Sequence, residues 1–176
     1  SGRIIGRIAP KKGIIDSLAA SPDGGTLYFT AGGTLWRIPS AGGEAIRIGA
    51  GDSLVMEPSG LGLVVQRRES ARVRMFRLPV DGGPEREIVL DRSIPLFSPF
   101  LSSGALDRQG RLAVSLNPPD SWFSAPGILD IATGRISRVP SAGLSDHDYV
   151  TWTNDGRIAA LQQGLQAAIW RFHRGP

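Results

Sequence analysis

The chain repeats a short pattern four times, and this repeat restricts the fold more than any other feature of the sequence. Four segments align without gaps on a turn glycine, and these glycines are 36, 50 and 46 residues apart. Self-similarity at such a period is typical of solenoids and propellers. The aligned segments are DSLAASPDG (16–24), DSLVMEPSG (52–60), SSGALDRQG (102–110) and DYVTWTNDG (148–156).

Each repeat predicts four short strands joined by turns. The turn glycine is followed by an apolar run of five or six residues, and a second run follows it in every repeat. A third run closes the first three repeats after an SAGG, VDGG or ATG turn. Short runs of β-branched and aromatic residues between Gly, Pro, Asp and Ser favour strands, and the 23 glycines and 13 prolines disfavour helices.

The runs that follow the turn glycines indicate which β-fold these strands build. They are apolar at successive positions instead of alternating, so we expect both faces of each sheet to be covered. That is the situation of a propeller blade and not of an open sandwich. We therefore predict an all-β fold, a single β-propeller domain over residues 1–176 or the C-terminal part of one. Its four-stranded antiparallel blades cover about 16–49, 52–90, 102–140 and 148–173.

Strand counting leaves the size of the ring open. The last repeat has three expected strands, including the run at 167–172, and the run at 3–9 supplies one strand of the closing type. These make about four blades, either a complete ring or a part of a larger propeller. We favour the larger propeller, because four-bladed rings are rare and Ser1 is not a natural start. The open blade edges of such a piece could pair with a second copy.

The first repeat carries the clearest resemblance to a known family. SPDGGTLYFTAGGTLWRIPSAGGE (21–44) is similar to the blade of the WD-like β-propellers of bacteria, the TolB-like group, and the later repeats keep this framework loosely. The resemblance covers nearly the whole chain. It implies a propeller fold and an envelope or extracytoplasmic (periplasmic) setting. It is less specific for function, because members of the group serve as scaffolds, sensor domains and gates on hydrolases.

Composition excludes several classes of function. The chain has no cysteine, which excludes thiolate metal sites, and no apolar run long enough to span a membrane, so we expect no membrane insertion. The net charge is +4, with 18 arginines and two lysines spread along the chain. The densest group, five arginines between positions 67 and 77, is interrupted by Glu69. We interpret it as a solvated surface with local ion pairs and expect no nucleic-acid partner.

Strand order predicts where a binding site lies. Loops that enter the first strand of each blade share a face with the loops that join its second and third strands. The aligned positions Asp16, Asp52, Ser102 and Asp148 then lie near the mouth of the central channel. Three carboxylates at one rim could bind a cation such as calcium. The alternative, which we favour, is that each Asp accepts backbone N–H bonds at its turn.

The loops on this predicted face supply further candidate residues. The longest one, LNPPDSWFSAP (116–126), displays Trp122 and Phe123, which either bind a partner or fold back over the blade. The preceding blade offers Arg67 and Arg68 as a site for an anion, or as a solvated hairpin tip. His147 stands between two aspartates at the rim, as a metal or acid–base group or as an ordinary surface residue.

We therefore predict a non-catalytic module that binds a protein or a small ligand at one propeller face, without a cofactor. Such a module fits the sensor or interaction domain of a larger bacterial protein. One alternative is a lactonase-type hydrolase whose calcium is held by Asp16, Asp52 and Asp148. A second alternative is the gating propeller of a peptidase. The sequence has no recognisable acid–base partner and no GxSxG motif, so we rank an enzyme below a binding module.

Overall fold

The computed structural model of the chain describes residues 14–70, 72–91, 96, 101–140 and 145–164. Every regular secondary-structure element in these ranges is a β-strand, which confirms the all-β prediction. The described ranges therefore contain no helix that could cross a bilayer. The strands expected at 3–9 and 167–172 lie outside the described residues.

The first two repeats each form a four-stranded antiparallel sheet in sequence order, as predicted. The first sheet contains β1 (Ile15–Ala20), β2 (Thr26–Ala31), β3 (Thr34–Pro39) and β4 (Ile46–Ala50). The second contains β5 (Ser53–Met56), β6 (Gly62–Glu69), β7 (Arg72–Pro79) and β8 (Arg86–Ile88). We call these sheets blades 1 and 2.

Blades 3 and 4 have fewer regular strands within the described ranges. Blade 3 contains β9 (Arg111–Leu116), β10 (Ala125–Asp130) and β11 (Ile136–Arg138), and blade 4 contains β12 (Asp146–Trp152) and β13 (Ile158–Gln163). The expected first strand of blade 3 is reduced to an isolated bridge between Leu106 and Leu112. A turn at residues 102–105, with Gly104 at a φ of 80°, leaves too little extended chain for a full strand there.

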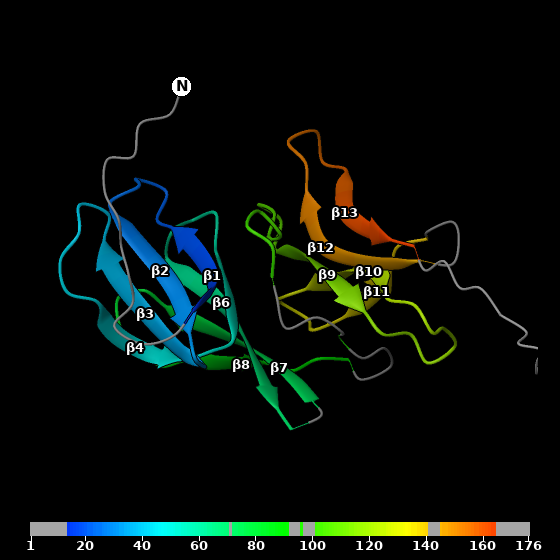
Figure 1. The fold of residues 1–176 in the computed structure, drawn as a ribbon, viewed down its shortest axis with the longest axis horizontal. Coiled ribbons are helices and arrows are strands. Elements are labelled where there is room, and N and C mark those ends of the chain that lie inside the picture. Colours follow the sequence, from blue (N-terminus) through cyan, green and yellow to red (C-terminus); the bar gives the residue numbers. More distant parts are fainter. Residues whose placement is uncertain (1–13, 71, 92–95, 97–100, 141–144, 165–176) are drawn as a thin grey trace, which may run out of the picture.

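The four sheets follow one another along an arc in the order of the sequence (Figure 1). In blade 1, β1 lies on the inner side of the arc and β4 on the outer side. The largest apolar cluster joins blades 2, 3 and 4 through residues such as Met75, Leu112 and Val150. A second cluster joins blades 1 and 2 through Tyr28 and Val65. Strand β6 is buried at five successive residues and β9 at five of its six, as expected for strands covered on both faces.

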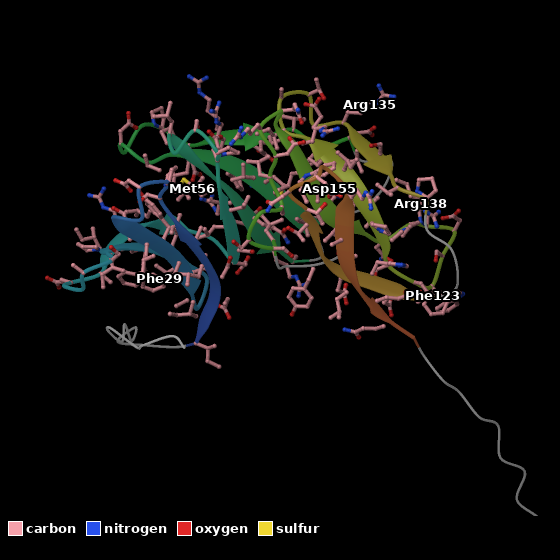
Figure 2. The ribbon with its side chains drawn as sticks, turned by 90° about the horizontal axis from the view of Figure 1, so that it is seen from above. Phe29, Met56, Phe123, Arg135, Arg138 and Asp155 are labelled. Carbon is pink, nitrogen blue, oxygen red and sulfur yellow. The ribbon has the colours of Figure 1, made fainter. Side chains whose placement is uncertain are left out.

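The repeated turn glycines have the backbone conformation that the sequence predicted. Gly24, Gly60, Gly110 and Gly156 have φ between 70° and 78°, a region that glycine enters without steric cost. Each glycine N–H donates to the carbonyl oxygen three residues earlier, at 2.8–3.2 Å. These turns, and those between the third and fourth strands, lie on one face of the arc. Figure 2 shows Arg135 and Met56 on this side and Phe123 on the other.

Candidate functional site

The loops that were predicted to share one face are joined there by hydrogen bonds. The Gly51 amide, just before β5, donates to the Gly33 carbonyl in the β2–β3 turn, with an N···O distance of 3.0 Å. The Ser124 amide, at the end of the β9–β10 loop, donates to the Asp146 carboxylate at 2.8 Å. Each bond connects the entrance of one blade to the loop between the second and third strands of the previous blade. We call this face the rim.

Two buried serines link neighbouring blades on the inner strands behind the rim. The Ser17 hydroxyl in β1 donates to the Leu54 carbonyl at 3.1 Å and accepts the Leu54 amide at 3.2 Å. The Ser53 hydroxyl in β5 accepts the Leu101 amide at 2.7 Å. Both side chains are buried, so these bonds fix the inner strands of blades 1, 2 and 3 relative to one another.

Asp16 and Asp52 differ in their surroundings although they are aligned in the repeat. Asp16 is exposed and sits at an irregularity in the β1–β2 pairing. The Asp52 carboxylate accepts the Arg68 amide at 2.6 Å, and the Asp52 carbonyl accepts the Thr30 hydroxyl at 2.9 Å. The donor to Asp52 therefore lies in the neighbouring strand β6 and not in the turn before β5, so this bond is not the one that the turn interpretation expected.

Arg67 and Arg68 are adjacent in blade 2, but their side chains have different surroundings. The Arg67 guanidinium donates to both Glu85 oxygens and to the Ala50 carbonyl, and it lies 4.1 Å from the centre of the Phe76 ring. The bond from Arg67 holds the pKa of Glu85 below its usual value. Arg67 is therefore engaged within the protein, whereas Arg68 is exposed.

The neighbouring arginines also form local ion pairs. Arg74 binds Glu69 and Glu87, and Arg77 binds the buried Glu57 with two hydrogen bonds. These pairs agree with the interpretation of the arginine group as a surface with local ion pairs.

The β9–β10 loop presents its tryptophan to solvent. Trp122 is 99% exposed, so it does not fold back over the blade, and Phe123 is half-buried. The Ser121 hydroxyl donates to the Phe123 carbonyl at 3.1 Å and accepts the Phe123 amide at 3.0 Å, which closes a tight turn around Trp122. The loop is tied to blade 4 by Ser124, whose hydroxyl accepts the His147 amide at 2.8 Å. An exposed indole on a fixed loop is suited to binding.

Three predicted rim residues carry buried polar atoms without a hydrogen-bond partner. They are the Ser102 Oγ, the His147 Nδ1 and the Asp148 Oδ1, and no other side chain in the described ranges has such an atom. Burial raises the pKa of Asp148, and the nearby Asp146 carboxylate raises it further. His147 and a hydrogen bond from Ser124 act in the opposite direction. Unpaired buried polar atoms are costly, so a water, an ion or a ligand group that bonds to them would stabilise this part of the rim.

The raised pKa of Asp148 predicts that an Asp148→Asn variant is more stable than the native chain at neutral pH. The native state binds the Asp148 proton more tightly than the unfolded state, so the stability from that proton is complete below the usual pKa of 3.8. It is lost as pH rises through the folded pKa. We expect the variant to melt at a higher temperature than the native chain at pH 7 and to lose this advantage near pH 3. Thermal melts at pH 7 and pH 3 measure the difference in melting temperature between the variant and the native chain. Asp16→Asn, at an exposed carboxylate, is the control.

The carboxylates proposed for calcium are not brought together. No group of three or more His, Asp or Glu side chains in the described ranges is placed to hold a metal ion, and those ranges include Asp16, Asp52 and Asp148. Two of the three have separate surroundings, Asp16 exposed in blade 1 and Asp148 beside Ser124 in blade 4.

Several residues at the rim were not singled out from the sequence. Ser17 and Ser53 are aligned with each other in the repeat, directly after Asp16 and Asp52, and this repeated serine could have indicated their role from the sequence. Ser124 could not be found, because its role depends on the contact between two blades. Tyr149 has a φ of 51°, unusual for a residue with a side chain, in the irregular part of β12, and it is half exposed.

Comparison with solved structures places the fold among known propellers. The similar structures include a putative TolB from Agrobacterium tumefaciens, with a TM-score of 0.65 and 20% identity, covering 84% of this chain and 53% of that one. A nidogen/laminin complex has a TM-score of 0.60 and 15% identity, and the match covers 85% of this chain and 57% of that one. A puromycin hydrolase S511A mutant complexed with PGG has a TM-score of 0.62 and 16% identity, and the match covers 82% of this chain and 24% of that one.

The chain therefore spans about half of the first of these proteins and a quarter of the hydrolase. No family model matches the sequence. No curated protein matches it either. At these identities the similarity concerns the fold, and it agrees with the blade pattern, the turn glycines and the arc of sheets. The chain has the fold of a TolB-like β-propeller, of which the described residues form a part.

Proposed function

We propose that this chain is a non-catalytic binding module that holds a protein partner at the rim, where blades 3 and 4 meet. The observation that carries the proposal is Trp122, which is 99% exposed on a loop whose base is hydrogen-bonded to β12. Leaving an indole in water costs hydrophobic free energy that a partner recovers when it covers the ring. Holding the loop in place before binding reduces the entropy lost on association.

The other candidate residues divide between contact and support in this proposal. In this proposal Phe123 in the same loop, with His147 and Asp148 at the start of β12, forms the contact surface with Trp122. Ser102 adjoins β12, because the Thr151 hydroxyl donates to the carbonyl of the next residue, Ser103, and it extends this surface. Arg68 and Asp16 are exposed farther along the rim and extend it. Asp52 and Arg67 support the hairpin of blade 2 through the Arg68 amide and Glu85.

We further propose that the module works as an interaction or sensor domain of a larger bacterial protein, in the periplasm or another extracytoplasmic setting. The similarity in fold to TolB and to a nidogen/laminin complex supports a protein partner. The puromycin hydrolase similarity keeps the gating propeller of a peptidase as the second candidate.

Thermal melts with added calcium distinguish a binding module from a calcium-dependent hydrolase. A site-bound ion stabilises the folded state by RT ln(1 + [Ca²⁺]/Kd), about 2.7 kcal/mol at a hundredfold excess over Kd. We expect millimolar calcium to leave the melting temperature unchanged, because the candidate carboxylates are not grouped. A dose-dependent rise that Asp148→Asn abolishes would instead support the hydrolase.

Site-specific photo-crosslinking tests the binding face. A photoreactive tryptophan analogue, which keeps an aromatic ring in place, is introduced at position 122 on the rim, or at the exposed position 61 in a turn on the opposite face. We expect one discrete crosslinked species from position 122 in cells that express the full protein, and none from position 61. Addition of excess unlabelled chain should reduce it. Crosslinks of equal yield from both positions, or from position 61 alone, would contradict the proposal.

A further inference from the structure

We infer that the rim surface beside Trp122 receives a cationic group, namely the lysine or arginine side chain of a protein partner. This inference rests on the proposed function and specifies its chemistry. The surface comprises Trp122 on the β9–β10 loop together with Asp146 and Asp148 at the start of β12. The Ser124 amide donates to Asp146, and the Cα atom of Trp122, two residues earlier, can lie at most about 7 Å from that of Ser124.

Two carboxylates lie close enough here to influence one another. The Asp146 carboxylate raises the pKa of Asp148, so the two charges interact. The Asp146 Oδ1 is occupied by the Ser124 amide, whereas the Asp148 Oδ1 is buried and has no hydrogen-bond donor. A positively charged group beside this pair would offset the repulsion between the two carboxylates.

The chain does not fill this place with a cation of its own. Neither Asp146 nor Asp148 forms an ion pair within the described ranges, although the protein has 18 arginines. Arg138 binds Asp120 at 3.5 Å, and Arg111 binds Asp107 while lying over the Trp152 ring at 4.6 Å. The blade 2 arginines at the rim show the opposite arrangement, since Arg67 and Arg74 are paired with glutamates.

Aromatic groups complete the recognition of a cation. An indole is the side chain that attracts ammonium and guanidinium groups most strongly over its ring face. Trp122 is 99% exposed, so its ring is open to solvent, and the Ser121 turn holds the backbone that carries it. A carboxylate pair beside an open indole therefore favours a lysine or arginine over a neutral or acidic side chain. The carboxylate pair is negative whereas the whole chain has a net charge of +4, so net charge alone would predict an anionic partner instead of a cationic one.

The four tryptophans of the chain make the test direct, because each gives one indole N–H signal in a ¹H–¹⁵N spectrum. Trp122→Phe assigns the Trp122 signal. The probe is Nα-acetyl-lysine methylamide, and the matched control probe is the same molecule with a neutral, Nε-acetylated side chain. We expect a saturable shift of the Trp122 signal with the charged probe and none with the neutral probe.

Variants connect this shift to the carboxylates. In the Asp146→Asn, Asp148→Asn double variant we expect the charged probe to bind about tenfold more weakly or worse, whereas Asp81→Asn, in the exposed β7–β8 turn on the opposite face, keeps native affinity. The dispersed amide spectrum shows that each variant is folded. Equal shifts with both probes, no shift, or native affinity in the double variant would overturn the inference. If crosslinking at position 122 persisted in that case, the cation inference alone would fail and the binding face would stand.

Discussion

Gly134→Ala is expected to lower the free energy of unfolding by about 2–5 kcal/mol. Gly134 has a φ of 71°, where a residue with a Cβ atom costs about 1–2 kcal/mol. A Cβ at this position would also lie 1.8 Å from the Val89 carbonyl oxygen. Backbone atoms must move to relieve that overlap, and such overpacking costs about 1–3 kcal/mol or more. The Gly134 carbonyl accepts the Asp91 amide at 2.8 Å, so the displacement would also disturb the junction between blades 2 and 3.

Gly156→Ala is the matched control. Gly156 has a similar φ of 78°, but no heavy atom outside its neighbours lies within 4 Å of the added Cβ. Its cost is then the backbone term alone, about 1–2 kcal/mol. Urea denaturation of the two variants measures the difference. Equal costs would show that the end of blade 2 does not pack against the turn of blade 3 as described.

Leu112→Ala is expected to lower the free energy of unfolding by about 2–5 kcal/mol. Leu112 is completely buried in the cluster shared by blades 2, 3 and 4, opposite Leu129 and bridged to Leu106. The substitution leaves a cavity where several sheets meet, and neighbouring sheets can close it only partly.

Leu61→Ala controls for the loss of a leucine side chain as such. Leu61 is 71% exposed, and we expect its truncation to change stability by less than about 0.5 kcal/mol. Chemical denaturation compares the two variants. A Leu112→Ala variant as stable as Leu61→Ala would contradict the packing of the blades.

Much of the fold could be predicted from the sequence because it depends on local features that recur. Asp-Gly and similar turns need a positive φ, and all four repeat glycines have it. The apolar runs after them predicted strands covered on both faces, which holds for β6 and β9 but not for β13, which is exposed at five of its six residues. The prediction of a first strand in blade 3 was wrong, because a turn at Gly104 interrupts a segment whose composition is still typical of a strand.

The candidate site was predictable only in part. Strand order alone placed Trp122 and Asp148 on one face. The alignment could not show that Asp52 has a backbone amide on its carboxylate while Asp148 has a buried oxygen without a donor. Nor could it show that Arg67 is held by Glu85, 18 residues away. These differences arise from contacts between hairpins and blades, and no local pattern encodes them.

Hydrogen exchange on the complex with the crosslinked partner tests the central claim most directly. If the rim binds the partner, amides in 117–124 and at the start of β12 will exchange more slowly in the complex. Amides in the turns at 21–25, 57–61 and 107–110, on the opposite face, will exchange as in the free chain. Slower exchange confined to those turns, with 117–124 unchanged, would contradict the account.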